Sequence, residues 1–340
     1  MLTASRSAFI FLSSSAIRTN AFVSLPPKSF VSVSISSSTA TTAMSPLISA
    51  AEALASAPTT RFIDASWHLN PDRDGETEFV NEAIPNSGFF DMNAISCKAS
   101  SNHKSLPHQR PSARTFELAC DKLHIPANSS PVILYGTKGC FSIPRTYYLF
   151  KHYFGHANCQ ILDGGLEAWK NAGGGTEAGT IQFENISETI ENDDGSSPTK
   201  YKVAKDDGNA MCDMESVEQA LLEAAATVID ARPANRFLGE VPEPRAGMRS
   251  GHMKGALNVP FPSLLTSMED QQYKPKSEIA SIFADSMGNE EEIILTCGSG
   301  VTACNLALGM ELAGKNMNKV RVYDGSWSEW GREGGGEVVL

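Results

Sequence analysis

Residues 292–303 read EIILTCGSGVTA, and this stretch decides the fold. A short apolar run, residues 293–296, ends at a cysteine with two glycines close behind it, and residues 303–313 have the spacing of a helix. The pattern therefore predicts a strand, a loop over residues 297–302 and a helix. In an open α/β sheet such a loop lies at the carboxyl ends of the strands, where ligands bind.

The same pattern occurs earlier in the chain, at residues 131–142, which read PVILYGTKGCFS. Three further pairs of stretches recur in the same order: 61–67 with 227–233, 83–91 with 252–261, and 158–169 with 319–330. Partners lie about 160 residues apart throughout, which indicates two copies of one domain. In each copy, short β-branched runs alternate with segments of helical spacing. We therefore expect two α/β domains with mostly parallel sheets covered on both faces.

Composition places the boundaries of these domains. Residues 1–50 hold fourteen serines, three basic residues and no acidic residue, which is typical of an organellar transit peptide. We expect a first domain over residues 51–175, a polar linker over 176–200 and a second domain over 201–340. The mitochondrion is the first predicted location and the plastid is its alternative. A disordered tail without an address would have the same composition.

The formal net charge of −11 argues against nucleic acid and anionic membranes as partners, because an acidic chain gains nothing from counterion release. The seven cysteines lack the paired spacings of a zinc site or of a disulfide framework. We therefore expect free thiols, a reducing compartment and no metal.

Cys297 lies on a loop that favours a thiolate. Gly298 and Gly300 can take a positive φ at no steric cost, so successive backbone N–H groups can form an anion-binding nest at the start of a helix. A small buried cysteine at a tight turn is the simpler interpretation. The corresponding residue of the first copy is Gly136, however, so the fold does not require a thiol here. This difference favours Cys297 as a nucleophile.

Other residues near these stretches are interpreted as structural. Cys140 does not align with Cys297, and Cys304 lies within the predicted helix, so both are expected in cores. Asp64 and Asp230 end corresponding strands and are expected to accept hydrogen bonds from backbone N–H groups.

These motifs together resemble the tandem rhodanese family of sulfurtransferases. The resemblance covers roughly residues 61–330 and includes DASW, FSIPR, LDGGLEAW, DARPANRFLGEVPEPRAGMRSGHMKGALNVPF and YDGSWSEW. It implies two rhodanese-like domains, each a five-stranded mostly parallel sheet flanked by helices. It also implies an inactive N-terminal half and a site in the cleft between the halves. The loop CGSGVTA is similar to the 3-mercaptopyruvate sulfurtransferase subgroup, whereas thiosulfate sulfurtransferases carry basic residues after the cysteine.

The resemblance implies that Cys297 takes the sulfur of 3-mercaptopyruvate as a persulfide and releases pyruvate. A thiol such as thioredoxin or glutathione, or cyanide, would then accept the sulfur, and no cofactor is implied. Arg236 and Arg245 match the family's carboxylate-binding arginines, whose guanidinium groups suit a planar carboxylate. Arg249 is expected to be a cation at the rim of the cleft that attracts anions.

The remaining expected contacts come from the loop itself. Ser299 is expected to donate a hydrogen bond to the ketone oxygen or to the leaving enolate, although a small residue at a loop need have no such role. The persulfide charge would be held by the backbone N–H groups of Gly298, Gly300, Val301 and Thr302.

The chain departs from its family in one respect and from a rival class in another. Ala83 stands where the family has been described with a histidine that works with a serine and an aspartate, so that relay cannot be assembled in the same way. Position 303 is an alanine, whereas phosphatases of the same fold need an arginine there to clamp phosphate. Thiosulfate sulfurtransferase activity is the nearest alternative, and a non-catalytic docking module is the more distant one.

Overall fold

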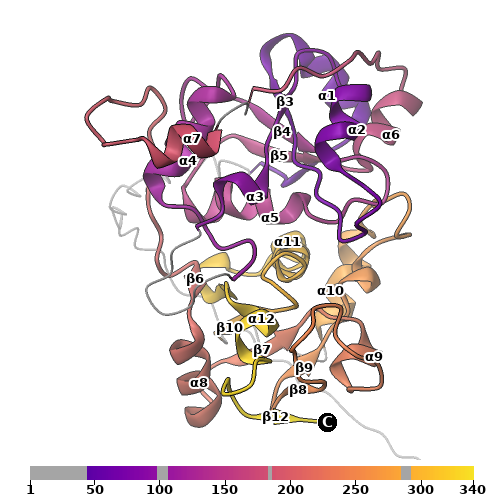
Figure 1. The fold of residues 1–340 in the computed structure, drawn as a ribbon. Coiled ribbons are helices and arrows are strands. Elements are labelled where there is room, and N and C mark those ends of the chain that lie inside the picture. Colours follow the sequence, from indigo (N-terminus) through magenta and orange to yellow (C-terminus); the bar gives the residue numbers. More distant parts are fainter. Residues whose placement is uncertain (1–43, 98–105, 183–185, 285–291) are drawn as a thin grey trace, which may run out of the picture. The chain divides into compact units, whose positions relative to one another are not determined.

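The structure is a computed structural model that describes residues 44–97, 106–182, 186–284 and 292–340. Two five-stranded sheets organise this part of the chain, one in each half (Figure 1). Nearly all of the predicted transit peptide lies outside the described residues, so the structure does not test that prediction.

The first half is built on a parallel sheet with the strand order β1-β5-β4-β2-β3. Its strands are β1 (Leu47–Ile48), β2 (Arg61–Asp64), β3 (Gly88–Phe89), β4 (Val132–Tyr135) and β5 (Cys159–Leu162). Its helices are α1 (Ala50–Ser56), η1 (Ala57–Thr59), α2 (Gly75–Asn81), α3 (Met92–Ile95), α4 (Ala113–Lys122), α5 (Ile143–Tyr148), η2 (Leu149–Tyr153), α6 (Gly165–Asn171) and α7 (Ile186–Glu191).

The second half repeats this topology in the order β6-β11-β10-β7-β9. Its strands are β6 (Met211–Cys212), β7 (Thr227–Asp230), β9 (Leu257–Asn258), β10 (Ile293–Thr296) and β11 (Val320–Tyr323), and β8 (His252–Met253) pairs antiparallel with β12 (Val338–Val339). Its helices are α8 (Met214–Glu223), α9 (Ala234–Phe237), η3 (Phe261–Leu264), α10 (Lys276–Ala284), α11 (Ala303–Leu312), η4 (Met317–Lys319) and α12 (Ser326–Trp330). The shared order confirms the predicted duplication.

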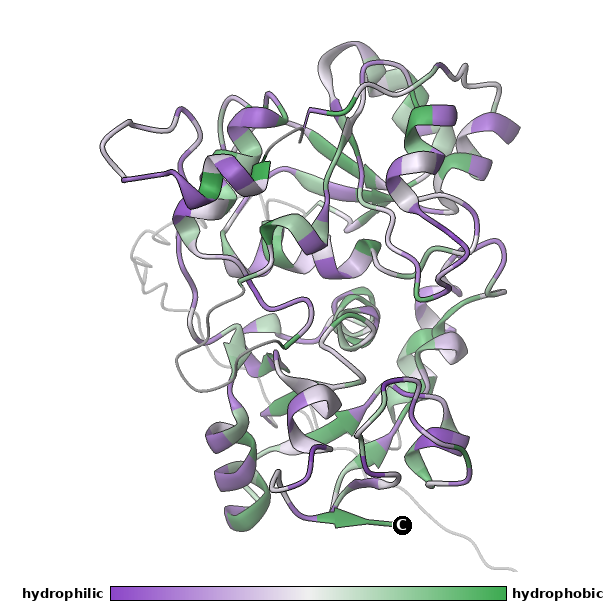
Figure 2. Cartoon of the chain, viewed as in Figure 1, coloured by the Kyte–Doolittle hydropathy of each residue, from purple (hydrophilic) through white to green (hydrophobic). Residues whose placement is uncertain are grey.

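The central strands explain why each sheet is covered on both faces. All residues of β4 and β10 are buried, as expected for strands between two layers of helices. Figure 2 shows the contrast with the outer layer, because the strands are mainly hydrophobic whereas α8 carries many hydrophilic residues. The strand predicted over residues 293–296 is confirmed. The helix after it ends at Leu312, since Gly314 takes a φ of 84° that cannot continue it.

The predicted limits of the first domain need two corrections. Leu47–Ile48 pair with β5 and α1 begins at Ala50, so residues 47–50 belong to the first domain rather than to the leader. Residues 176–200 are not a free linker, because Glu177 forms a bridge with Ala83 and α7 packs against α3 and α4. Residues 47–50 adjoin the serine-rich leader and residues 176–200 are polar, and composition does not reveal that the first complete a sheet edge and that the second cover a helix.

Candidate active site

The candidate nucleophile lies on the loop between β10 and α11. Cys297 is only 1% exposed. Its N–H donates to Oγ of Ser326 at 3.2 Å, and its carbonyl accepts from the N–H of Trp327 at 2.9 Å. The carbonyl of Gly298 likewise accepts from the N–H and from Oγ of Ser328, at 2.9 and 2.6 Å. The start of α12 therefore binds the carbonyl side of the loop and fixes its orientation.

The same loop leaves a run of backbone N–H groups without protein acceptors. Within the described part of the chain, the N–H groups of residues 298–302 donate to no other residue. Gly300 has a φ of 75°, and a Cβ at this position would lie 2.9 Å from the carbonyl oxygen of Asp324, so only glycine fits. Helix α11 begins directly after the loop and adds the positive end of its dipole. These groups together suit an anion centred on the Cys297 sulfur.

Arg245 places an unpaired guanidinium beside this loop. It forms no hydrogen bond or ion pair with any residue that the structure describes. A Cβ built on Gly298 would lie 3.9 Å from its Nη1. Burial lowers the pKa of Arg245, and the neighbouring Cys297 thiol opposes this shift. The guanidinium is thus available to a carboxylate next to the thiol.

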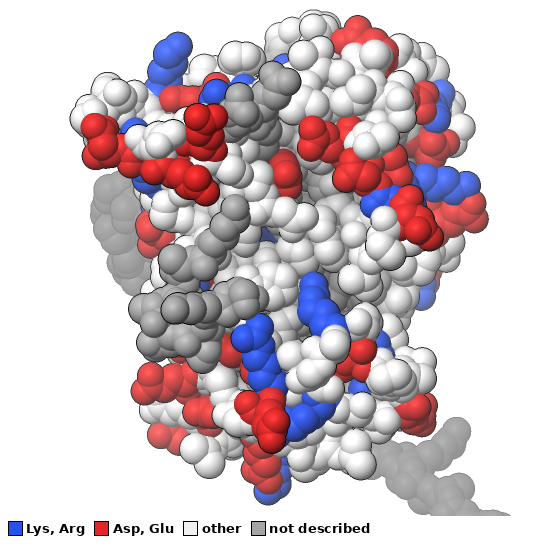
Figure 3. Space-filling view, in the orientation of Figure 1, with Lys and Arg blue, Asp and Glu red and all other residues white. Residues whose placement is uncertain are grey.

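Arg236 reaches the same loop but is already held by a carboxylate. A Cβ on Gly298 would lie 3.4 Å from its Nη2, which is ion-paired with Glu243. Glu243 also accepts from Nη1 of Arg232 at 2.7 Å, so one carboxylate orients two arginines. Figure 3 shows acidic side chains mainly on the upper part of the viewed face and a group of Lys and Arg side chains in its lower centre, on a protein whose net charge is −11. The positive charge around Cys297 is therefore a local feature of an acidic protein.

The donors of Arg249 bind backbone carbonyls, and its expected role as a cation at the rim of the cleft stays a prediction. Its Nη2 donates to the carbonyls of Trp330 and Gly336, at 2.7 and 2.8 Å, and its Nε donates to the carbonyl of Gly331 at 3.3 Å. Arg249 therefore ties the C-terminal segment to the end of α12. The sequence pattern did not reveal this, because the carbonyls come from residues about 80 positions away that only the fold brings near.

Ser299 contacts a histidine of the first half. Its side chain is 5% exposed, and its Oγ lies 3.1 Å from Nδ1 of His108. Burial, together with the charges of Arg245 and Arg145, lowers the pKa of His108 to about 3, so the ring is neutral at pH 7. His108 is absent from the predicted site residues because it lies outside every recurring stretch, and nothing in the local sequence marks it.

A buried ion pair joins the two halves next to this contact. Nη2 of Arg145, on α5, donates to Oδ1 of Asp324 at 2.6 Å, and both side chains are almost completely buried. The same Nη2 donates to the carbonyl of His108 at 2.7 Å, and Nη1 lies 3.5 Å from the carbonyl of Gly300. Arg145 therefore links the first half to the loop that carries Cys297. Arg145 is part of FSIPR, one of the stretches that resemble the family, but the sequence does not indicate its role.

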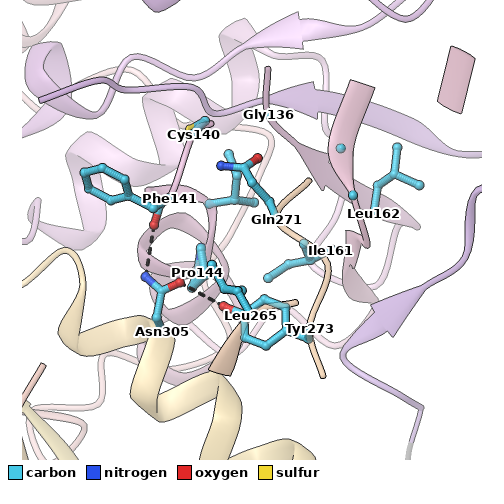
Figure 4. A pocket seen from close by; sticks show the side chains of 13 residues that line it. Gly136, Cys140, Phe141, Pro144, Ile161, Leu162, Leu265, Gln271, Tyr273 and Asn305 are labelled. Atoms are coloured by element: carbon cyan, nitrogen blue, oxygen red, sulfur yellow. Dashed lines mark hydrogen bonds between the residues drawn. The ribbon is translucent and has the colours of Figure 1, made fainter. Parts of the chain in front are cut away.

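The first half's counterpart of the loop is filled by its own side chains. A Cβ on Gly136 would lie 2.7 Å from Cδ1 of Ile143, so no thiol fits at this position without displacing that side chain. Beside it is a cavity of about 30 Å³, enough for about one water molecule, closed partly by residues of the second half (Figure 4). In Figure 4 Asn305 binds the carbonyl of Phe141 and the hydroxyl of Tyr273 across this cavity. The geometry gives this half no room for a substrate at the corresponding loop.

The two cysteines expected in cores are buried. Sγ of Cys140 lies 3.1 Å from Oγ of Ser142, and burial raises its pKa. Sγ of Cys304 contacts the carbonyl of Gly300 at 3.4 Å, and burial raises its pKa to about 12. Both thiols are therefore protonated at pH 7, which is unfavourable for a nucleophile.

No described group of three or more His, Cys, Asp or Glu side chains is arranged to hold a metal ion. Among the described helices, none is long and apolar enough to cross a membrane.

Two regions of the chain, residues 49–172 and 213–333, match the family model of the rhodanese-like domain. The chain belongs to the rhodanese family. The match to both halves confirms the predicted pair of rhodanese domains, each with a five-stranded parallel sheet flanked by helices.

Relatives of this rhodanese match most of its length. Thiosulfate/3-mercaptopyruvate sulfurtransferase 1, mitochondrial, of Arabidopsis thaliana is 34% identical over 284 residues, which cover 80% of this chain and 72% of that protein. The 3-mercaptopyruvate sulfurtransferase of Rattus norvegicus is 35% identical over 275 residues, which cover 79% and 84%. The crystal structure of SseA from Escherichia coli, described as a 3-mercaptopyruvate sulfotransferase, matches with a TM-score of 0.67 at 32% identity, covering 84% of this chain and 100% of that one. This rhodanese is accordingly a sulfurtransferase.

Proposed function

We propose that this rhodanese moves the sulfur of 3-mercaptopyruvate to a persulfide on Cys297, releases pyruvate, and passes the sulfur to a thiol or to cyanide. One observation carries the proposal: the unpaired guanidinium of Arg245 lies beside a buried cysteine whose loop has N–H groups without acceptors. A donor for this arrangement needs a carboxylate for the arginine and a transferable sulfur within reach of the thiol. Mercaptopyruvate carries both.

In the first step the Cys297 thiolate attacks the thiol sulfur of the donor. A sulfur–sulfur bond forms, the carbon–sulfur bond breaks, and its electron pair stays on the carbon as the enolate of pyruvate. The proton of the donor thiol moves to that carbon, so pyruvate and an anionic persulfide are the products and charge is conserved. The N–H groups of residues 298–302, which donate to no other described residue, would stabilise the charge of the persulfide.

In the second step an acceptor thiolate attacks the outer sulfur of the persulfide. The sulfur–sulfur bond breaks and Cys297 leaves as a thiolate, ready for another donor. With a thiol such as thioredoxin or glutathione, the product is a persulfide on the acceptor. With cyanide, the product is thiocyanate.

The donor carboxylate is assigned to Arg245, with Arg236 at its side. Guanidinium groups bind a planar carboxylate through two parallel hydrogen bonds, and Arg245 has its donors free among the described residues. Ser299, on the loop itself, is assigned to the ketone oxygen or the leaving enolate.

Thiosulfate is the second candidate donor, because the Arabidopsis relative is named for both donors. A dianion without a carboxylate is favoured by several free cations around the loop. Arg236 is paired with Glu243, and Ser299 is uncharged, so Arg245 is the cation left for it among these residues. We therefore place 3-mercaptopyruvate first.

We further propose that residues 1–43 direct the protein to an organelle, the mitochondrion first and the plastid as the alternative. The serine-rich, acid-free composition and the mitochondrial relative in Arabidopsis support this location. A fluorescent protein fused behind this segment should collect in one of the two organelles, and a diffuse cytosolic signal would contradict the proposal.

Mass spectrometry of the intact protein tests the sulfur transfer. After incubation with 3-mercaptopyruvate, the wild type should gain about 32 Da, and a reducing thiol should remove it. Cys297→Ser should gain nothing, whereas the control Cys304→Ser should gain the same mass as the wild type. A wild type without the gain, or an undiminished gain in Cys297→Ser, would contradict the mechanism. Incubation with thiosulfate in parallel ranks the two donors.

A further inference from the structure

His108 reaches the catalytic loop from the first half of the chain, 191 residues before its partner Ser299. Its Nδ1 lies 3.1 Å from Oγ of Ser299, and its side chain is buried with 6% exposed. Its backbone has a φ of 59°, in the left-handed region that residues other than glycine rarely adopt. A strained backbone at a buried polar contact persists only where the surroundings fix it.

Four contacts fix the segment around His108, two with residues of the first half and two with Asp324 of the second half. Its carbonyl accepts from Arg145 at 2.7 Å, and its ring packs edge-on against Trp67 with centroids 4.5 Å apart. The side-chain amide of Gln109 donates to the carbonyl of Asp324 at 3.1 Å, and the N–H of Arg110 donates to Oδ2 of Asp324 at 3.0 Å. The histidine ring is thus held on the serine by a rigid frame.

We infer that His108 is a positioning residue for the sulfur transfer, because its hydrogen bond directs the Ser299 hydroxyl at the mouth of the Cys297 loop. The inference rests on the proposed function and adds to it a residue from the half that carries no nucleophile. Since a serine hydroxyl rotates freely when unbonded, a partner on its oxygen restricts the direction of its proton.

The protonation state of the His108 ring determines which hydrogen bond it makes with Ser299. The charged groups around it are Arg145 and Arg245, which disfavour the imidazolium, and Asp324, which is itself paired with Arg145. The ring therefore stays neutral. With its proton on Nδ1, it donates to Oγ of Ser299, and the serine proton is left for the oxygen of the pyruvate enolate as that charge develops. His108 neither gains nor loses a proton in this sequence.

Two substitutions at position 108 separate the ring from its backbone. His108→Gly removes the ring and relieves the left-handed backbone, whereas His108→Asn tolerates this backbone and places a side-chain amide N–H near the place of Nδ1. His108→Gly should lower kcat for 3-mercaptopyruvate about tenfold and change KM little, because the contact acts mainly in the transition state. His108→Asn should restore most of kcat. The matched control, Gln109→Ala, removes a docking hydrogen bond of the same segment and should leave kcat within about twofold.

A double-mutant cycle with Ser299→Ala decides between positioning and mere docking. Ser299→Ala should lower kcat about as much as His108→Gly, and His108→Gly should have no further effect in that background. Two outcomes would overturn the inference and leave the proposed function intact. In the first, His108→Gly lowers kcat equally with and without Ser299. In the second, Gln109→Ala lowers kcat as much as His108→Gly does. A wild type that gains no sulfur on Cys297 would instead refute the proposed function, and the inference with it.

Discussion

Asp64 should make the protein less stable as pH rises, and Asp64→Asn should remove this effect. Asp64 and Asp230 end the corresponding strands β2 and β7 and are both buried. Asp230 is paired with the guanidinium of Arg232, but the matching position in the first half is Ser66. Oδ1 of Asp64 accepts from the N–H of Ser66 at 2.8 Å, and its Oδ2 has no partner. The first half therefore buries a carboxyl group without a compensating cation.

The pKa of Asp64 gives the sign and size of the effect. Burial raises this pKa from 3.8 to about 7. The folded protein thus holds a proton that the unfolded chain has released, so stability falls as pH rises from about 4 to about 7 and is constant above that. The full difference of about 3 pH units corresponds to about 4 kcal/mol, of which about 2 to 3 kcal/mol is lost between pH 5 and pH 8.

Urea unfolding of the wild type and of Asp64→Asn measures this directly. The stability of Asp64→Asn relative to the wild type should be greater at pH 8 than at pH 5 by about 2 to 3 kcal/mol. The matched control is Asp230→Asn, which should lower stability by roughly 3 to 5 kcal/mol because it deprives the buried Arg232 of a partner. The same stability difference between Asp64→Asn and the wild type at both pH values would refute the reasoning.

Two further substitutions test the site and the contact between the halves. Arg245→Met should raise KM for 3-mercaptopyruvate by about 10- to 100-fold in initial-rate assays, because charge-assisted hydrogen bonds to the carboxylate are lost; an unchanged KM would contradict the assignment. Arg145→Met should lower the free energy of unfolding by roughly 3 to 5 kcal/mol, since it leaves the buried carboxylate of Asp324 with only the more exposed Arg110 as a cation. Arg114→Met, which removes a more exposed ion pair, should cost far less, and equal losses would refute the role of burial.

The predicted loop and its nucleophile follow from patterns that act over short distances. Residues 293–296 are apolar throughout and are found as a fully buried strand, and Gly300 takes the positive φ that its neighbours require. The repeat gave a second test of the nucleophile, because the first half has the same strand and loop with Gly136 in place of the cysteine. Backbone conformation and hydrophobic periodicity depend on residues that are close together in the sequence, so both can be predicted from the sequence alone.

The contacts that were not predicted join partners that are distant in the chain. The sequence did not reveal that the donors of Arg249, expected as a rim cation, bind carbonyls near the C-terminus. Leu47–Ile48 lie next to the serine-rich leader in the sequence, but they form the edge strand of the first sheet. In both cases the partners are backbone groups, which every residue carries, so the sequence holds no signature of them.

The sequence by itself determined the duplication, the α/β class of each half, the glycine loop after β10 and the cysteine that only one copy carries. The tertiary structure decided which arginine beside Cys297 is unpaired and that the first half places His108 and Arg145 against the catalytic loop. These contacts join residues that are more than a hundred positions apart in the sequence; Arg145 and Asp324, for example, are separated by 179 positions. They depend on the packing of the two halves against each other, in which α5 lies against α11, and no local pattern encodes that packing.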